Sequence, residues 1–437
     1  MADAKTSSSV LPRLLKVAER AKAHPEQRLL ALAHLIDEDA LARAYERLRI
    51  DAAVGVDGVT VEAYGQRLAE NVRGLWNRMK AGKYRHQPIR RVHIPKDDGT
   101  TRPIGISTTE DKIVQGAVRE VLEAVYEQDF KGCSYGFRPG RSAHDAIRRI
   151  HEVAKAGAAN YVLEADIVSF FDSIDRKMLM EMLRERIADE SLMRLVGKCL
   201  HVGILDGTEY EETEQGTTQG SVLSPLLGNV YLHHVLDTWY EREVRPRLKG
   251  RSELVRYADD LVICFENQDD ARRVFDVLPK RMAKYGLKLH PEKTRLVDLR
   301  PPNGGNGTGG GTFDFLGFTL LRQRTRYGKW MLCCRTRRRS LRRFLGGVAE
   351  WCRRHRHLPV KDQHLTLSRK LVGHYNYFGV NGNLDALRRV LFGVTRTWRK
   401  WLHRRSQNAR MYWKRFHAVL NALPLPSPKI TVQIWGR

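Results

Sequence analysis

The chain of 437 residues has no run of about 18 consecutive apolar residues, so no membrane-spanning segment is predicted. Its first segment, MADAKTSSSVLPRLLKVAER, lacks the apolar core of a signal peptide, which favours a cytoplasmic location. The six cysteines form no Cys-x-x-Cys pair and no finger-like spacing with histidine. We therefore expect neither a disulfide framework nor structural zinc, and reduced buried thiols account for the set.

Acidic residues are scarce in the last part of the chain. Residues 321–437 hold 28 Lys and Arg against three acids, Glu350, Asp362 and Asp385, a net charge of +25. The whole chain, with 76 Lys and Arg against 50 Asp and Glu, has a net charge of +26, so residues 1–320 are nearly neutral. An excess of this size predicts a polyanionic partner rather than a generally basic surface, and it assigns that partner to one region.

The composition, with 42% hydrophobic residues, predicts a globular protein of two or three domains. Predicted strands and helices alternate irregularly through the first three quarters of the chain, which indicates an α+β fold. Apolar residues recur at helical spacing from Val61 to Met79 and predict one amphipathic helix ending near Gly82. Beyond about residue 335, Arg-rich sequence with Leu, Phe and Trp at helical intervals predicts a basic helical region.

Three short segments place charged residues at strand ends. The run VHIPKDDGTTRPIGI predicts a hairpin around Asp98-Gly99 that presents Lys96 and Arg102. The run YVLEA (161–165) predicts a buried strand ending at Asp166. Two apolar runs, 254–257 and 261–265, flank Asp259 and Asp260 and predict a second hairpin.

Asp259 and Asp260 allow two interpretations. Aspartate is common in turns, so the pair is compatible with a solvated turn. Carboxylates are also the protein ligands that Mg²⁺ prefers, and a metal would relieve the repulsion between them. Asp166 favours the metal, because a carboxylate at the end of a buried strand is costly unless it is paired or metal-bound. If its strand lies beside the second hairpin, three carboxylates converge as two-metal nucleotidyl transfer requires.

Nine sequence blocks in order resemble those of bacterial group II intron-encoded reverse transcriptase/maturases. They are GVDGVT (55–60), IPKDDGTTRPIGI (94–106), YGFRPGRSAHDAI (135–147), ADIVSFFDSID (165–175), QGTTQGSVLSPLLGNVYLH (215–233), RYADDLVICF (256–265), GLKLHPEKT (286–294), FDFLGF (313–318) and GHYNYF (373–378). The resemblance implies an α+β right-hand polymerase, with fingers and palm, followed by an all-α thumb/maturase domain. It implies the division 1–50 N-terminal helical extension, 51–320 fingers and palm, 321–400 thumb/maturase domain and 401–437 basic DNA-binding-like tail without an endonuclease domain.

The resemblance also implies roles for residues at matching positions. Asp166, Asp259 and Asp260 would be the catalytic residues and, with the backbone carbonyl of Ile167, the ligands of two Mg²⁺ ions. Lys96, Arg102, Phe171, Gln219 and Lys293 would bind the nucleotide, with Phe171 beneath its sugar. Each role has a structural alternative. Lys96 and Arg102 could simply lie on a solvated face of the hairpin, and Phe171 could form a core pair with Phe170. Lys293 could be an ordinary surface lysine. Thr218, Ser221 and His374 stand where the family usually has Pro, Gly and Trp.

The implied function is RNA-directed DNA synthesis in the bacterial cytoplasm, coupled to binding the parent group II intron RNA. The expected partners are that RNA, an RNA template with a DNA primer, dNTPs and target DNA for target-primed reverse transcription, with no membrane partner. Two alternatives differ in class. The chain could be a splicing factor with little polymerase activity, or a reverse transcriptase recruited to host defence. The sequence leaves the oligomeric state open.

Overall fold

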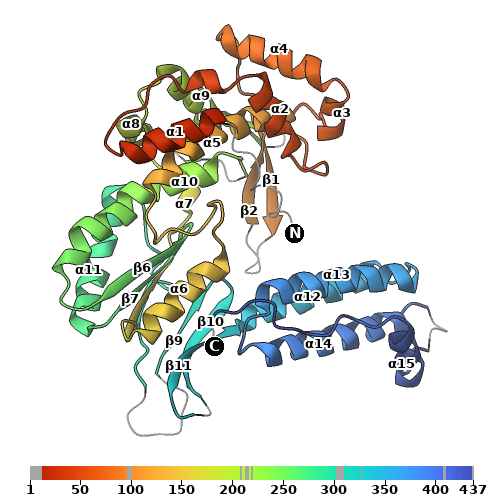
Figure 1. Cartoon of the computed structure of the whole chain (residues 1–437). Coiled ribbons are helices and arrows are strands. Elements are labelled where there is room, and N and C mark those ends of the chain that lie inside the picture. The colour runs from red at the N-terminus through yellow and green to blue at the C-terminus, as the bar shows by residue number, and fades with distance from the viewer. Residues whose placement is uncertain are drawn as a thin grey trace.

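The computed structural model describes residues 12–95, 101–206, 209–211, 216–217, 220–301, 310–325, 327–406 and 410–435. Figure 1 shows a helical lobe with a projecting hairpin, a central sheet with helices, and a helical arm extending to one side. Across these ranges, none of the helices is both long and apolar enough to cross a bilayer. The predicted α+β fold followed by a helical region is confirmed.

The helical lobe forms from the N-terminal third of the chain together with two later helices. Its helices are α1 (Pro12–Ala23), α2 (Glu38–Glu46), α3 (Val61–Gly65), α4 (Leu68–Lys80), α5 (Thr109–Asp129), α8 (Arg176–Arg186) and α9 (Glu190–Leu200), with a 3₁₀ turn at Ala33–Leu35. The prediction of a single helix from Val61 to Met79 is wrong, because the helix is interrupted between α3 and α4. The Asn71 side chain donates to the Tyr64 carbonyl at 2.9 Å, and Gly65 lies against the Tyr45 hydroxyl.

The first predicted hairpin is confirmed. Strands β1 (Ile89–Pro95) and β2 (Thr101–Ile106) pair antiparallel from Arg90 opposite Ile106 to Pro95 opposite Thr101. The first strand also pairs with β4 (Ile204–Asp206), which pairs with β5 (Glu209–Glu211). The hairpin projects from the lobe toward the centre of the molecule (Figure 1), so Arg102 lies near its far end.

The central sheet has the antiparallel order β6 (Ser252–Tyr257), β7 (Asp260–Phe265), β3 (Tyr161–Ala165) and β8 (Arg295–Asp298). Successive side chains alternate between its faces. Leu163, Leu254 and Ile263 belong to one buried cluster with α11 (Gln268–Lys284), whereas Val162, Val255 and Val262 belong to a second with α6 (Ala143–Lys155). Both faces are therefore covered, which explains why the middle residues of β3, β6 and β7 are mainly apolar.

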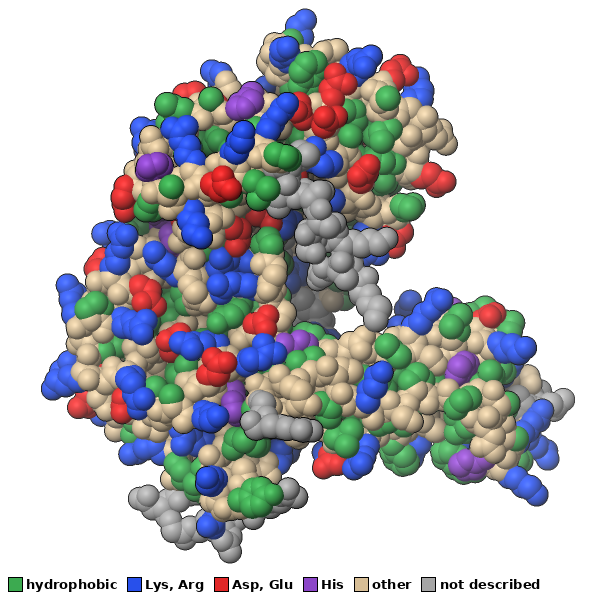
Figure 2. Space-filling model, viewed as in Figure 1, with side chains coloured by type: hydrophobic (Ala, Val, Ile, Leu, Met, Phe, Trp, Pro, Cys, Tyr) green, Lys and Arg blue, Asp and Glu red, His purple; other side chains and the backbone are tan. Residues whose placement is uncertain are grey.

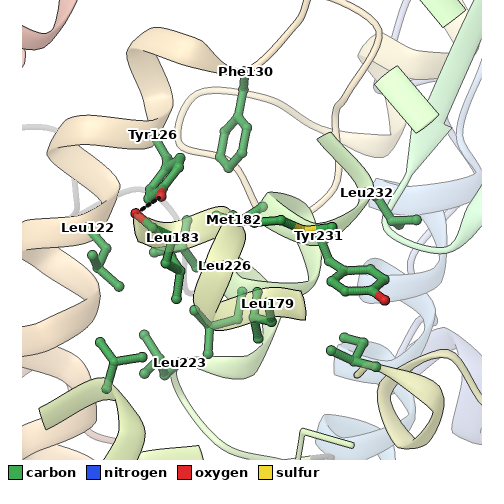
Figure 3. Close-up of a cluster of buried hydrophobic side chains, with 14 of the residues drawn as sticks. Leu122, Tyr126, Phe130, Leu179, Met182, Leu183, Leu223, Leu226, Tyr231 and Leu232 are labelled. Carbon is green, nitrogen blue, oxygen red and sulfur yellow. Dashed lines mark hydrogen bonds between the residues drawn. The ribbon is translucent and has the colours of Figure 1, made fainter. Parts of the chain in front are cut away.

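A third set of contacts joins the lobe to the sheet. Leu122 and Tyr126 of α5 and Phe130, which directly follows it, pack with side chains of α8 and with residues on and next to α10 (Ser224–Leu232), as Figure 3 shows. Pro225 stands in the first turn of α10, and the helix continues through π turns at His233–Asp237 and Tyr240–Val244 to a 3₁₀ turn at Arg245–Arg247. The Tyr231 hydroxyl donates a hydrogen bond to the Tyr285 carbonyl at 2.7 Å. Helix α10 is therefore held by apolar packing and by a hydrogen bond.

The helical arm follows a second, three-stranded sheet of order β11 (Trp330–Thr336), β10 (Phe318–Arg324) and β9 (Thr312–Phe315). Its helices are α12 (Arg338–Arg354), α13 (Val360–Phe378), α14 (Leu384–His403) and α15 (Trp413–Ala422). Trp398 is fully buried in the arm, and its indole donates to Gln363 at 3.1 Å.

The edges of these elements do not coincide with the predicted domain boundaries, which stay predictions. Strand β10 runs through residue 320, and α14 runs through residue 400. After α15 the chain returns to the central body, where Val432 bridges to Val380 and the Trp435 ring stacks on His151 at 5.0 Å. The last described residues are thus packed against α6, next to the central sheet.

His374 makes the arm sensitive to acid. Its ring packs between Phe344, at 4.3 Å, and Phe378, at 4.7 Å, and its buried Nε2 atom has no hydrogen-bond partner in the described part of the chain. Burial lowers the pKa of His374 to about 4, so folding favours the neutral ring. The resulting stability is complete above the unfolded pKa near 6.5 and falls as the pH drops toward 4.

We expect His374→Phe to remove an acid-dependent loss of about 2 kcal/mol at pH 5, while changing stability little at pH 7.5. Urea unfolding at the two pH values measures this difference. His201→Phe, at an exposed histidine at the end of α9 in the helical lobe, is the control and should keep the full acid dependence. An unchanged pH dependence in His374→Phe would contradict the assignment.

Candidate active site

The turn between β6 and β7 presents the two adjacent aspartates. Tyr257 pairs with Asp260, so Ala258 and Asp259 form a two-residue turn. Ala258 has a φ of 56°, in the left-handed region that costs a residue with a Cβ about 1–2 kcal/mol. Strain of this kind persists only where the surroundings impose it, and it concentrates at functional sites.

Asp166 comes to the same place from the neighbouring strand. Strand β3 pairs with β7 so that Ala165 lies opposite Leu261, and Asp166 follows directly at the end that carries Asp260. The predicted adjacency of this strand and the hairpin is confirmed. The chain therefore brings three carboxylates to one edge of the central sheet.

The three carboxylates influence one another electrostatically. Removal from water by the surrounding atoms, followed by the negative charges of Asp259 and Asp166, raises the pKa of Asp260 to about 7. Because the residue is exposed to solvent at the start of β7, the upward direction and the repulsion between the carboxylates carry the argument. Burial and the charge of Asp166 also raise the pKa of Asp259. The Nζ atom of Lys293 lies 2.6 Å from Oδ2 of Asp166 and supplies one balancing positive charge. The three carboxylates therefore repel one another, and the Lys293 ammonium neutralises only part of their negative charge.

Hard divalent cations fit this set of donors, because carboxylate oxygens are the ligands they prefer. Among the described residues, no group of three or more His, Cys, Asp or Glu side chains is placed so that it could hold a metal ion by itself. Mg²⁺ in proteins commonly uses one or two carboxylates, with water and substrate phosphates as its other ligands. The mutual repulsion of the carboxylates is the observation that favours a cation here.

The backbone after Asp166 is held by the segment that contains Lys293. Ile167 bridges to Leu289, the amide of His290 donates to the Asp166 carbonyl, and the amide of Val168 donates to the Lys288 carbonyl, both at 2.8 Å. The Ile167 carbonyl accepts neither of these two bonds. The same segment therefore orients Asp166 and places Lys293 beside it.

Phe170 and Phe171 form helix α7 (Phe170–Ser173) with Asp172 and Ser173. Phe170 is buried in the main core, whereas Phe171 is partly buried and packs against it with ring centroids 5.1 Å apart. The amide of Thr217 donates to the Phe171 carbonyl at 2.7 Å. Phe171 thus keeps an accessible surface close to Asp166 in the chain, and its role stays a prediction.

Of the remaining nucleotide-binding predictions, the structure places only Arg102. It is exposed on β2, and its positive charge acts on Asp259 and opposes the upward shift of that carboxyl's pKa. Lys96 and Gln219 lie outside the described residues. The loop after Gln219 is anchored to the helical lobe, because Gln115 accepts hydrogen bonds at 3.1 Å from the Ser221 hydroxyl and the Val222 amide.

Sequence reasoning missed Arg256, which supports the turn from within the core. Arg256 and Asp237 are both fully buried and form a double ion pair with distances of 2.8 and 2.6 Å. The same guanidinium donates to the Asn229 side chain at 2.9 Å, to the Ser134 hydroxyl at 2.8 Å and to the Ala258 carbonyl at 3.0 Å. An arginine inside the apolar run LVRYADD was the available signal.

Gly136 also contacts the turn directly. A Cβ at this position would overlap the amide nitrogen of Ala258 and come within 3.0 Å of the Tyr257 carbonyl carbon. The Gly136 carbonyl accepts a hydrogen bond of 2.8 Å from Asn229, which also binds Arg256. The GFRPGRS loop and the catalytic turn are therefore packed as one unit.

The GHYNYF block joins the arm to this site. Tyr377 stacks on Phe318 at 5.7 Å, lies 5.4 Å from the His144 ring, and donates to the Leu316 carbonyl at 2.8 Å. Burial raises the pKa of Tyr377 to about 12, with smaller contributions from Tyr257 and Asp260. In Figure 2 the surface is hollowed between the lobe and the arm.

Sequence comparisons show to which family the chain is similar. The model of the reverse transcriptase (RNA-dependent DNA polymerase) family matches residues 94–320. Protein YkfC of Escherichia coli (strain K12) is 33% identical over 356 residues, 72% of this chain and 89% of YkfC. The group II intron-encoded protein LtrA of Lactococcus lactis subsp. cremoris is 36% identical over 203 residues, 46% of this chain and 34% of LtrA.

A fungal protein extends the same pattern. The 91 kDa protein in the cob intron of Schizosaccharomyces pombe is 34% identical over 238 residues, 54% of this chain and 29% of that protein. The chain thus spans about a third of the length of these two intron-encoded relatives, but most of YkfC. The matched segment contains Asp166, Asp259 and Asp260. The chain belongs to the reverse transcriptase family, and its resemblance to the group II intron-encoded members is confirmed.

Proposed function

We propose that the chain is a Mg²⁺-dependent RNA-directed DNA polymerase whose Asp166, Asp259 and Asp260 bind two Mg²⁺ ions. The observation that carries the proposal is the meeting of these carboxylates at one sheet edge, where burial and mutual repulsion raise the pKa of Asp260 to about 7. When bound, such ions activate the primer 3′-hydroxyl and stabilise the leaving pyrophosphate. Nucleotide addition then depends on positioning and charge rather than on a covalent enzyme intermediate.

The surrounding residues suit the remaining tasks. Arg102, with Lys96 as its partner on the hairpin, would bind the triphosphate, since a guanidinium offers two parallel donors to phosphate oxygens. The Ile167 carbonyl would complete the shell of one ion, and Gln219 would contact the nucleotide. Lys293 lies at Asp166 and would move to the nucleotide once a metal neutralises that carboxylate.

Primer extension tests the polymerase directly. The full chain is incubated with an RNA template, a labelled DNA primer, dNTPs and Mg²⁺, and we expect DNA product that reaches the template end. Chelation of the metal should abolish the product, and renewed Mg²⁺ should restore it. Absence of product with both Mg²⁺ and Mn²⁺ would refute the proposed activity.

Binding to a parent group II intron RNA is the second part of the proposed function. The charge of +25 in residues 321–437 supplies the electrostatic component of RNA binding, and LtrA is by name a group II intron-encoded protein. Target DNA and retromobility follow as further proposals. A splicing assay with a group II intron RNA, with and without the chain, tests this part separately, and splicing that the chain does not accelerate would contradict it. Among the described residues, no contact favours a splicing factor without polymerase activity or a role in defence.

Phe171 provides a prediction about substrate choice. In the proposed site its accessible ring lies beneath the sugar and excludes a 2′-hydroxyl. We expect Phe171→Ala to increase incorporation of ribonucleotides relative to deoxyribonucleotides about tenfold to a hundredfold, measured as the ratio of kcat/KM values. Phe170→Leu, at the buried neighbour, should leave this ratio unchanged. An unaltered ratio in Phe171→Ala would exclude the assigned role.

A further inference from the structure

An exposed aromatic ring beside the catalytic turn has no part in the site described above. Phe137 lies in the loop between α5 and α6, and 48% of its surface is exposed. Its ring centroid is 6.4 Å from that of Tyr257, the residue that precedes the turn, with a tilt of 44° between the rings. The ring therefore extends the surface of the site away from the three carboxylates.

The backbone of Phe137 is in a conformation that its side chain disfavours. Its φ is 59°, in the left-handed region, where a bulky residue is an outlier. Glycine or asparagine would occupy this conformation at lower cost. Since the ring is also not buried, the fold gains little from a phenylalanine here, and an outlier of this kind indicates a functional constraint.

The residues on both sides of Phe137 fix it in place. Arg138 is buried, pairs with Glu127 at 2.9 Å, and donates to the carbonyls of Lys131 and Ser134 at 2.9 and 3.0 Å. Gly136 is held by Asn229 and by its contact with Ala258. The loop is thus rigidly tied to the catalytic turn, and the exposed ring has a defined position relative to Asp259.

We propose that Phe137 stacks on a nucleotide of the template–primer duplex next to the catalytic turn. This inference rests on the proposed polymerase function, because a primer whose 3′-hydroxyl reaches the three carboxylates ends at the turn beside which Phe137 lies. An aromatic ring offers a π face that accepts any base or sugar without regard to sequence. Such a contact would hold the duplex while successive nucleotides are added.

Two substitutions at this position test the proposal with the full chain. Phe137→Gly removes the ring and suits the φ of 59°, so we expect its thermal midpoint to equal or exceed that of the parent. Its dissociation constant for a fluorescently labelled RNA–DNA primer–template, measured by anisotropy, should rise roughly tenfold, and the KM for that duplex should rise with it. The kcat should change little. Phe137→Trp should restore binding.

Val277→Ala is the control, because Val277 is 46% exposed on α11 and lies outside the segment to which RNA binding is assigned. Its affinity for the duplex should match the parent. Parent-like binding by Phe137→Gly would overturn the proposal, and so would a joint loss of thermal stability and binding, which indicates a structural role. If the parent binds the duplex but extends no primer, the polymerase proposal fails while the anisotropy comparison still decides the role of Phe137.

Discussion

Replacement of Arg256 by methionine is expected to destabilise the protein by about 3–5 kcal/mol and to abolish primer extension. The substitution leaves Asp237 fully buried without its partner, and an uncompensated buried charge carries a penalty of this size. It also removes the hydrogen bond to the Ala258 carbonyl, which helps hold the strained turn. Denaturant unfolding measures the loss of stability, and primer extension measures the loss of activity.

Two further variants separate charge from geometry. Arg256→Lys keeps the positive charge but cannot make all of the guanidinium's hydrogen bonds, so we expect a smaller loss of stability together with a large loss of activity. Adding Asp237→Asn to Arg256→Met should recover part of the stability, because it removes the unpaired charge. Arg245→Met, at a half-exposed pair with Glu241, is the control and should cost less than about 1 kcal/mol. If Arg256→Met lost no more stability than Arg245→Met, the proposed role of the buried Arg256–Asp237 pair would be refuted.

An Asp259→Asn variant is expected to lose primer extension by on the order of a thousandfold, equivalent to about 4 kcal/mol of transition-state stabilisation. The amide keeps the shape of the side chain but removes the negative charge that holds a cation. Stability should not fall, since burial and Asp166 disfavour the charged form of Asp259 in the folded protein. With one negative neighbour removed, the pKa of Asp260 should also fall from about 7.

Asp276→Asn serves as the control for this variant, because Asp276 is exposed on α11. Its rate of primer extension and thermal midpoint should match those of the parent. Retention of more than a tenth of the parental rate by Asp259→Asn would show that this carboxylate is not a metal ligand required for nucleotide addition. A large fall in its thermal midpoint would instead assign Asp259 a structural role.

The catalytic edge of the sheet was predictable because its signals are local. The apolar runs around Asp166 and Asp259-Asp260 predict strands, and Pro225 predicts the start of a helix, so the order of the elements follows from short segments. The carboxylates meet because β3 pairs with β7. That pairing joins segments far apart in the chain. The sequence predicted that the carboxylates would converge only if the two strands were neighbours.

The errors and omissions arose where distant residues determine the local structure. The helix predicted from Val61 to Met79 breaks at Gly65, which lies against Tyr45, although the apolar spacing continues on both sides. Arg256 finds Asp237 through the fold, and no spacing rule identifies two buried charges as partners. The left-handed φ of Phe137 was equally hidden, because only glycine and asparagine signal that conformation reliably.

The strand that runs through residue 320 has a consequence for work with fragments of this protein. Phe318 and Leu320 belong to the same buried cluster as Val162 and Val255 of the central sheet, and β10 pairs along its length with β11. A fragment ending at residue 320 would lose the partner strand and expose both the edge of β10 and this apolar cluster. Exposed apolar strand edges promote aggregation. The nearly neutral catalytic half and the basic arm should therefore be expressed and assayed as one folded unit.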